Sequence, residues 1–576
     1  MPKPYSLFSY AVACAALSES VQAVYNSSHH DPTVTIHNGK IKGLYNPSLH
    51  QESFLGIPYA QPPVGHSRFA RPEPLNSTWS TPFAANDYGK FCHGTSLNLE
   101  GFDQEGITYP EDEDCLTLNI VRPSTNNDSS RLPVLVWIYG GGFQEGGSGD
   151  ARYNMSSLVQ QSVAMEKPII GVSLNYRVSV LGFPSGQVFR EQGLTNLGLH
   201  DQRLALHWIQ ENIEAFGGDS SRVTIQGESA GAGSVGFHLL GSGHGTGLFQ
   251  GAIAQSGGPF HYMPFASYEV QDSLLETLVN TTGCSFASDT LSCLKSVPAS
   301  VLMQASANVT WSPVLDGDLL TQPNSIALRK AEFVQVPLLI GSNTNEGTPL
   351  VPSFSSIAAN NSGDFTAALT QFNAGRAISA EATSRFQDLY LDLKPEALQK
   401  ELGTVLPDPG ESYGSVYGSV SLLLGDLLFT AGRRIAAEAW ARNGVDAYSY
   451  RFDTVPAGVD PTTMGACHFS EVAFVFHNTE GGGYENDPFD IRDISLRQKY
   501  LDLSNLMSRM WISFVNTGSP NHHGVPGFPT FWPKYSNIQP QNMVFNAKDG
   551  VTLEPDNYRT EGITLIGDMA GAQGRK

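Results

Sequence analysis

The sequence is poor in charge, and most of the charge it has is negative. Lys and Arg total 34 and Asp and Glu total 55 in 576 residues, which gives a formal net charge of −21 at pH 7. Lys/Arg-rich runs are missing, and an acidic surface repels phosphate backbones, so we expect no nucleic-acid partner. Blocks of like charge hardly occur, which argues against a solvated tail protein or a coiled coil.

Long apolar runs are missing as well. The N-terminal run over residues 5–17 is much too short to cross a bilayer, and no later run reaches about 18 uninterrupted apolar residues. Lys3 precedes the run and Val-Gln-Ala follows at residues 21–23, an arrangement typical of a cleaved export signal. We therefore expect residues 1–23 to be a signal peptide and the protein to be secreted, without stable membrane insertion. A disordered N-terminal extension is the alternative.

Glycosylation sequons support export. One such short pattern means little, but several on a chain with a signal peptide make glycosylation a reasonable expectation, on loops that face solvent. The sequons stand at Asn26, Asn76, Asn127, Asn154, Asn280, Asn308 and Asn360.

Cysteine is scarce, with 6 residues, one of them in the expected signal. No Cys-x-x-Cys and no His/Cys cluster indicates a metal site, and we expect neither a metal nor a cofactor. In an oxidising compartment two close pairs favour local disulfides, Cys92–Cys115 and Cys284–Cys293, although spacing alone does not prove this connectivity. Cys467 is left over, and a buried inert thiol is its simplest interpretation.

Short β-branched runs alternate with amphipathic segments. The apolar runs at residues 134–139, 169–174, 223–225 and 337–340 are continuous, as expected for strands buried on both faces of a parallel sheet. Residues 202–216 and 494–515 show helical spacing of apolar side chains. The alternation predicts an α/β fold. Length alone suggests three or four domains at about 150 residues each, but repeats and long linkers are missing.

One turn concentrates the chemistry. Residues 227–231 read Gly-Glu-Ser-Ala-Gly, directly after the predicted strand at 223–225. In a strand-turn-helix, this spacing holds Ser229 in a strained conformation with its hydroxyl exposed, and the two glycines let strand and helix approach closely. The pattern also occurs by chance, but its position after a buried strand favours a nucleophile over an ordinary serine.

A serine nucleophile needs hydrogen-bond donors for the developing oxyanion. In sites of this kind one N–H group comes from the residue after the nucleophile, here Ala230, and others from a glycine-rich loop. Residues 140–143 read Gly-Gly-Gly-Phe after the predicted strand ending at Tyr139. A flexible turn is the alternative; a phosphate-binding loop is disfavoured because the Gly-x-x-x-x-Gly-Lys pattern is missing.

These motifs resemble the type-B carboxylesterase family of α/β-hydrolases, which includes cholinesterases and fungal esterase/lipases. Residues 216–231 fit the family's serine signature, 113–119 its second signature and 56–69 its N-terminal segment. Similar segments run from about residue 32 to about residue 547. The resemblance implies an α/β-hydrolase fold, with a central, mostly parallel β-sheet flanked by helices, as one domain over residues 24–576.

The resemblance also implies a catalytic triad in the chain order Ser-Glu-His. Glu346 follows the predicted strand at 337–340, where the family places its acid, and His468 precedes an apolar run that matches the run after the family's catalytic histidine. Ser256 resembles a serine beside the family's acid. The remaining site residues that we expect are the oxyanion-hole donors Gly141, Gly142 and Ala230, and the substrate-binding residues Phe143, Glu228 and Phe260.

Substrate choice is less strongly indicated. Cholinesterase-like members hold a quaternary ammonium by cation–π contact with a tryptophan in the first disulfide loop, and the loop between Cys92 and Cys115 has no tryptophan. It is also short and polar for the amphipathic lid of the related fungal lipases. We therefore expect a secreted serine carboxylesterase that hydrolyses small-molecule or lipid esters, with a preference for soluble or short-to-medium acyl chains. The alternatives are a triacylglycerol lipase, a specialised natural-product esterase and a non-catalytic, cholinesterase-like binding protein. The oligomeric state is not predicted.

Overall fold

A computed structural model describes residues 31–573, apart from 98, 100–101, 103–106, 125–130, 242–246, 261–264, 352–357, 372–377 and 529–530. The expected signal at residues 1–23 and the sequons at Asn26 and Asn127 lie outside the described residues.

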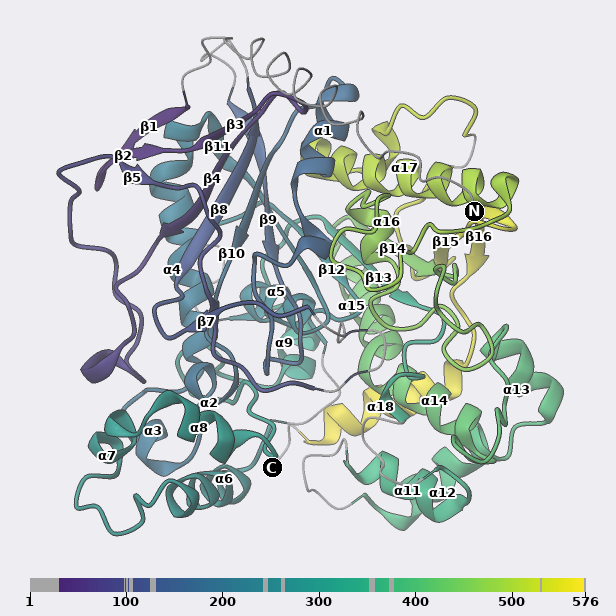
Figure 1. Ribbon diagram of the computed structural model, residues 1–576. Coiled ribbons are helices and arrows are strands. Elements are labelled where there is room, and N and C mark those ends of the chain that lie inside the picture. Colours follow the sequence, from purple (N-terminus) through teal and green to yellow (C-terminus); the bar gives the residue numbers. More distant parts are fainter. Residues whose placement is uncertain are drawn as a thin grey trace, which may run out of the picture.

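The described residues form an 11-stranded sheet that runs through the centre of the molecule (Figure 1). From β15 to β10 neighbouring strands are parallel, and antiparallel pairs occur only towards the two edges. This confirms the expected α/β-hydrolase architecture. The strands, from one edge to the other, are β16 (Gly550–Pro555), β15 (Gln541–Asn546), β14 (Ala447–Phe452), β13 (Leu338–Asn343), β12 (Gly251–Gln255), β11 (Gly218–Glu228), β9 (Leu132–Ile138), β10 (Ile170–Leu174), β8 (Thr117–Pro123), β4 (Gln51–Pro58) and β3 (Leu44–Asn46).

The continuous apolar runs became central strands because both of their faces are covered. Every residue of β9, β10, β12 and β13 is buried, which requires packing on both sides of the sheet. The predicted helix at 494–515 is α17 (Ile494–Thr517), which packs on β9 and β11. The predicted helix at 202–216 begins earlier, as α4 (Leu197–Asn212), and ends in a 3₁₀ turn over Ile213–Phe216.

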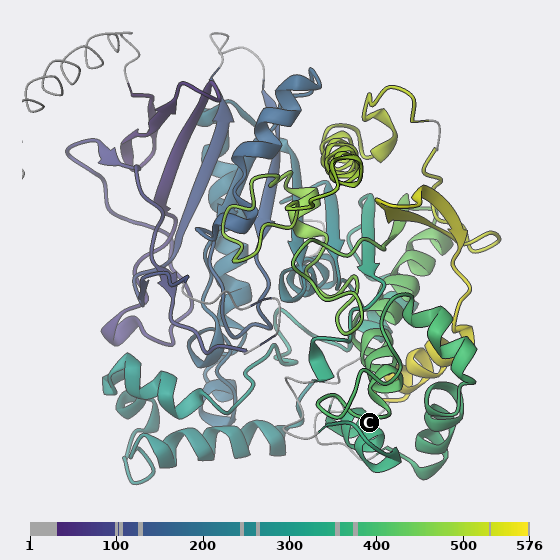
Figure 2. The same ribbon diagram turned by 45° about the vertical axis from the view of Figure 1, so that its right-hand side comes forward.

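Two groups of helices gather at the lower end of the sheet in Figure 1, and Figure 2 shows the same grouping after rotation. One group, α6 to α8, follows β12, and the other, α11 to α14, follows β13. The remaining helices pack along the sheet or on one another. The bounds of the helices in the two groups and of the others not yet given are α1 (Ser156–Ala164), α2 (Ser179–Gly182), α3 (Gln187–Glu191), α5 (Ala230–Leu240), α6 (Tyr268–Thr281), α7 (Thr290–Ser296), α8 (Ala299–Ser306), α9 (Asn324–Lys330), α11 (Ser362–Gln371), α12 (Ala380–Phe386), α13 (Pro395–Leu402), α14 (Tyr417–Gly425), α15 (Ala431–Arg442), α16 (Val472–Val475) and α18 (Thr560–Gln573).

Two disulfides fasten peripheral segments, as expected from the cysteine spacing. Cys92–Cys115 spans the small two-stranded sheet of β6 (Phe91–Cys92) and β7 (Glu111–Asp112), and Cys284–Cys293 joins α7 to the loop before it. A further sheet near the N-terminus contains β1 (Thr33–Ile36), β2 (Gly39–Lys42) and β5 (Phe83–Ala84). Cys467 is buried and is not in a disulfide.

The sequon residues that the structure describes lie at the surface. The described sequon residues are all exposed, as glycan attachment requires: Asn76, Asn154, Asn280, Asn308 and Asn360. Among the described residues, no helix combines the length and the apolar character needed to cross a membrane.

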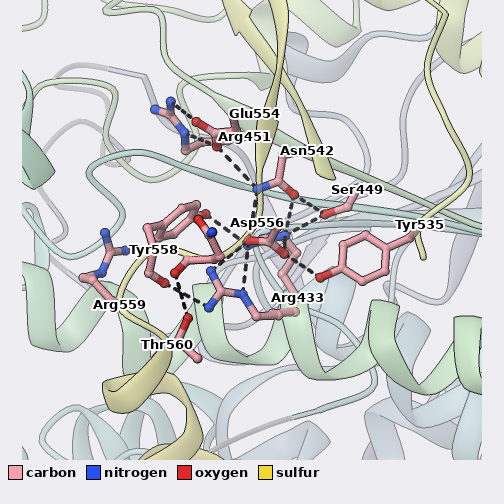
Figure 3. Close-up of polar contacts among 12 residues, drawn as sticks. Arg433, Ser449, Arg451, Tyr535, Asn542, Glu554, Asp556, Tyr558, Arg559 and Thr560 are labelled. Carbon is pink, nitrogen blue, oxygen red and sulfur yellow. Dashed lines mark hydrogen bonds and ion pairs between the residues drawn. The ribbon is translucent and has the colours of Figure 1, made fainter. Parts of the chain in front are cut away.

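The C-terminal part is tied to the sheet by a buried ionic cluster (Figure 3). Arg433 and Arg434 on α15 both donate to the Asp556 carboxylate, which directly follows β16. Asn542 of β15 and Tyr535 also donate to this carboxylate, at 3.1 and 2.7 Å. We call this group of side chains the Arg433–Asp556 cluster.

Candidate active site

Ser229 lies in a sharp turn between β11 and α5. Its backbone has φ 56° and ψ −123°, a strained conformation for a residue with a side chain. The flanking glycines are required here, because a Cβ on Gly227 would lie 2.3 Å from the Gly231 backbone and one on Gly231 would lie 2.1 Å from the Ile138 carbonyl. Ser229 remains partly exposed between buried neighbours. The strand, the tight turn and the helix thus follow one another at Ser229, and the serine is less buried than its neighbours.

Glu346 and His468 come together from segments 122 positions apart in the sequence. Glu346 follows β13, is 1 % exposed and lies with one oxygen 2.7 Å from His468 Nδ1. Its other oxygen accepts hydrogen bonds from Ser256 Oγ and from the Asn343 N–H, both at 2.6 Å. The carboxylate is thus held on both sides, and it orients the imidazole.

The other nitrogen of His468 faces the nucleophile turn. Nε2 lies 3.3 Å from Glu228 Oε1, and Glu228 directly precedes Ser229. In the part of the chain that the structure describes, the Ser229 hydroxyl makes no hydrogen bond to His468. Such bonds are often long in ligand-free sites and tighten when substrate binds. The imidazole thus lies between the Glu346 carboxylate and the residue that precedes Ser229.

Two buried carboxyl groups contact this imidazole, and a third, that of Glu471, lies near enough to act on it electrostatically. Burial raises the pKa of Glu228 well above its usual range, and Glu471 and Glu346 add to that rise. Burial also raises the pKa of Glu471. For His468 burial acts downward, but the neighbouring carboxylates outweigh it and raise the pKa above its usual value. The site thus favours a positively charged imidazole, the form that appears after His468 takes a proton.

Several residues of this site were not predicted from the sequence. Glu471 is wholly buried and accepts from Asn343 Nδ2 at 2.7 Å and from Gln255 Nε2 at 3.1 Å. Phe429 lies tilted against the His468 imidazole, with ring centroids 4.5 Å apart, and comes from a π-helical turn over Asp426–Thr430. Gln255 and Asn343 each end a parallel strand, a position where polar side chains often serve a site. Nothing in the sequence singles out Phe429.

The glycine-rich loop lies beside the nucleophile. A Cβ on Gly140 would come within 3.0 Å of the Ser229 Cβ, so the loop can approach this closely only as glycine. Gly141 and Gly142 adopt φ 95° and 59°. Ala230 is the first residue of α5, where backbone N–H groups have no partner within the helix and the helix dipole favours negative charge. The expected donors therefore come from two sides of the Ser229 turn.

The expected substrate-binding side chains are buried. Phe143 is 7 % exposed and packs on Phe183, with ring centroids 5.0 Å apart. Phe260 is 3 % exposed and lies beside Gly432. Glu228 is fully buried against His468, and neither of its oxygens accepts a hydrogen bond within the described residues. The segment at 261–264 lies outside those residues.

A metal-holding group of His, Cys, Asp or Glu side chains does not occur in the described ranges. The site consists of backbone N–H groups and of hydroxyl, imidazole and carboxyl side chains.

Comparisons with known proteins identify the family of this chain. The model of the carboxylesterase family matches residues 30–572. Lipase 2 of Diutina rugosa is 31% identical over 571 residues, covering 93% of this chain and 96% of the relative. Secreted lipase 1 of Botryotinia fuckeliana is 32% identical over 580 residues, covering 93% and 92%.

Solved structures show the same fold. The crystal structure of Aspergillus niger EstA superposes with a TM-score of 0.79 at 27% identity, covering 95% of this chain and 99% of that one. A structure described as PNB esterase gives a TM-score of 0.73 at 28% identity, covering 93% and 100%. With a family match over nearly the whole chain, this protein belongs to the type-B carboxylesterase/lipase family and is a carboxylic ester hydrolase.

Proposed function

We propose that the protein is a secreted serine carboxylesterase that works through a Ser229–Glu346–His468 triad. The observation that carries the proposal is the 2.7 Å contact between the buried side chains of His468 and Glu346, beside the strained Ser229 turn. Side chains that are this far apart in the sequence have little reason to meet at a nucleophile turn unless they act together.

In the proposed reaction His468 removes the Ser229 proton as the serine oxygen attacks the ester carbonyl carbon. The N–H groups of Gly141, Gly142 and Ala230 stabilise the oxyanion, and His468 returns the proton to the leaving alcohol. A water molecule, activated by His468, then releases the acid from the acyl-enzyme. Glu346 holds the imidazole in the required tautomer throughout.

The proposal gives a site-shaping role to three further residues, Glu228, Phe143 and Phe260. The Glu228 carboxyl faces the His468 Nε2 atom, through which the proton passes, so it acts on the imidazole and the leaving group. Phe143, at the end of the glycine-rich loop, packs on Phe183, and Phe260 lies beside Gly432 of α15; in this proposal both support the acyl-binding region.

Secretion of a single-domain protein over residues 24–576, after removal of residues 1–23, completes the proposal. Two disulfides and exposed sequon residues support an oxidising, glycosylating route. Secreted lipase 1 of Botryotinia fuckeliana, a relative at 32% identity, is named for such a location.

The preferred substrates are soluble esters with short-to-medium acyl chains, and a triacylglycerol lipase is the second candidate. The names of similar proteins do not decide between these two activities. The two relatives described above are named lipases, whereas the two solved structures are named EstA and PNB esterase. The test is a chain-length series of p-nitrophenyl esters beside emulsified triglyceride. Strong activation at the oil interface would favour the lipase.

The triad is tested with Ser229→Ala in the purified secreted protein. We expect hydrolysis of p-nitrophenyl butyrate to fall to background while thermal unfolding is unchanged or shifts upward. A matched control is Ser221→Ala, in the same strand but at an exposed position, which should keep full activity. A Ser229→Ala variant as active as the wild type would disprove the assignment.

A further inference from the structure

The residue after the Gly-Gly-Gly-Phe loop is a buried glutamine, Gln144, that is 3 % exposed. Its amide nitrogen donates to the Gly142 carbonyl at 3.1 Å and to the Trp311 carbonyl. Its amide oxygen accepts from the Trp311 N–H at 3.2 Å. Gln144 therefore joins the candidate oxyanion loop to a backbone segment 167 positions away in the sequence.

Gly142 needs such a restraint because it has no side chain to limit its rotation. The peptide before its Cα contains the Gly142 N–H group, and that peptide is held by the Gly141 carbonyl, which accepts from the N–H groups of Gln144 and Glu145 at 2.8 and 3.1 Å. The peptide after its Cα contains the Gly142 carbonyl, which accepts from the Gln144 side chain. With both peptides held, the direction of the Gly142 N–H is fixed.

The backbone segment to which the Gln144 side chain hydrogen-bonds is itself held in place. Trp311 is 1 % exposed, and three residues on, Val314 is held by Asn196, which accepts from its N–H at 2.9 Å and donates to its carbonyl at 2.8 Å. Two carboxamides thus pair with this segment in the same way. Only the Gln144 amide also reaches the oxyanion loop, and this makes Asn196 a matched comparison.

We propose that Gln144 is a positioning residue for the oxyanion hole: by bonding the Gly142 carbonyl while it is clamped to the Trp311 backbone, it aims the Gly142 N–H at the developing oxyanion. The proposal deepens the proposed function and rests on it. Gln144 itself does not touch the reacting atoms in this scheme; it acts through Gly142.

The first test is Gln144→Met, which keeps the length of the side chain and removes its hydrogen bonds. Removing an oxyanion donor outright costs about 10²- to 10³-fold in kcat, so misdirecting one should cost about 10- to 100-fold. We expect this loss in kcat for p-nitrophenyl butyrate, with KM changed less than about threefold. A pure packing role would instead change KM and thermal stability together.

A transition-state analogue isolates the oxyanion. An alkyl trifluoromethyl ketone forms a bond from its carbonyl carbon to the Ser229 oxygen, the serine proton passes to His468, and the carbonyl oxygen becomes an oxyanion in the hole. Gln144→Met should weaken this inhibitor by the same factor as kcat, while inhibition by butyrate, the product acid, stays within about twofold. Equal weakening of the two ligands would overturn the proposal.

Asn196→Gly is the control. It removes the two hydrogen bonds between the Asn196 side chain and the Val314 backbone, and glycine tolerates the φ of 53° at this position. We expect kcat and the affinity for the trifluoromethyl ketone to stay within about threefold of the wild type. If Asn196→Gly reproduces the Gln144→Met losses, the effect belongs to the Trp311–Val314 segment, and the proposed role of the Gly142 bond is wrong.

Gln144→Glu supplies a readout that does not depend on how well Gln144→Met folds. When protonated, the introduced carboxyl can donate to one carbonyl oxygen; when ionised, it repels the Gly142 and Trp311 carbonyls. The kcat of the variant relative to wild type should therefore fall as pH rises, with unfolding followed at each pH. A pH-independent ratio of the variant kcat to the wild-type kcat would contradict the proposal.

The failure of the proposed function and the failure of this inference have different outcomes. If the wild type itself fails to hydrolyse esters, the proposed function fails, whereas an active wild type with unaffected variants overturns only the role of Gln144.

Discussion

Two of the buried groups of charged side chains among the described residues differ in how their charges are matched. In the Arg433–Asp556 cluster one carboxylate meets two guanidinium groups. Both Asp556 oxygens accept several hydrogen bonds, and Figure 3 shows the donors converging on them. Burial alone would raise the pKa of Asp556, but Arg433 and Arg434 outweigh it and hold the pKa below its usual range. The Asp556 carboxylate is thus paired with cations and hydrogen-bonded at both oxygens, as expected of a structural ionic cluster.

The cluster around His468 has the opposite imbalance. Three buried carboxyl groups, of Glu228, Glu346 and Glu471, act electrostatically on one imidazole, and the Glu228 oxygens accept no hydrogen bond among the described residues. An unsatisfied buried carboxyl is costly, and such groups persist mainly where chemistry uses them. The comparison teaches that charge matching, more than burial, separates the candidate active site from a structural ionic cluster.

The largest effect should come from breaking the His468 cluster at its acid. Glu346→Gln keeps the shape of the side chain but favours the wrong imidazole tautomer, so we expect kcat to fall by about 10⁴-fold. The free energy of unfolding should stay level or rise, because one of three crowded carboxyl groups is neutralised. Ester hydrolysis and denaturant unfolding measure the two quantities. A variant that lost stability while keeping its kcat would reverse the functional assignment of this cluster.

Neutralising the carboxylate of the Arg433–Asp556 cluster should lower the free energy of unfolding and leave kcat nearly unchanged. Asp556→Asn leaves two buried guanidinium groups without their counter-charge, so we expect a loss of about 3–5 kcal/mol in the free energy of unfolding. The kcat of the molecules that remain folded should stay within about twofold.

This contribution has a defined pH dependence. Because the pKa of Asp556 is lower in the folded than in the unfolded protein, its stabilisation is fully present above the unfolded value of about 3.9 and disappears as pH falls through the folded value. The gap in unfolding free energy between wild type and Asp556→Asn should therefore be constant at neutral pH and shrink only in strong acid. A gap that changes near neutrality would point to another titrating group.

Much of the fold could be predicted because the central strands are continuous apolar runs. Residues 134–139 and 337–340 became β9 and β13, and Ser229 and Glu346 follow strands at positions that local sequence marks. The boundaries were less accurate: β11 begins at Gly218, before its apolar run, since pairing with β9 extends it.

The partners of the triad could not be predicted in the same way. Phe429 reaches His468 only because a π-helical turn between α14 and α15 projects it there, and Gln144 meets Trp311 across a long stretch of sequence. Both contacts depend on tertiary packing, which leaves no local periodicity. Glu228 lies inside the serine motif, but its unsatisfied oxygens are visible only in three dimensions.

A smaller effect should follow from removing the unmatched carboxyl. Glu228 is among the groups that raise the pKa of His468, and the imidazole must be neutral to accept the Ser229 proton. Glu228→Gln should lower that pKa, so the rise of kcat/KM with pH should move to lower pH. Glu73→Gln, an exposed site, is the control and should leave the profile unchanged. An unmoved profile in Glu228→Gln would mean that this carboxyl carries no charge in the working enzyme.

The smallest effect concerns the aromatic face of the His468 cluster. Phe429→Leu keeps an apolar side chain but removes the ring that lies tilted against the imidazole, with centroids 4.5 Å apart. Aromatic ring contacts contribute about 0.5–1.5 kcal/mol, so kcat should fall about 2- to 10-fold, with little change in the free energy of unfolding. Phe333→Leu, which removes a stacked ring 4.0 Å from Trp440 on α15, should do the reverse and lower stability without affecting kcat. If both substitutions lower only stability, Phe429 packs beside His468 without positioning it, and the contrast between the two parts of the molecule then rests on charge alone.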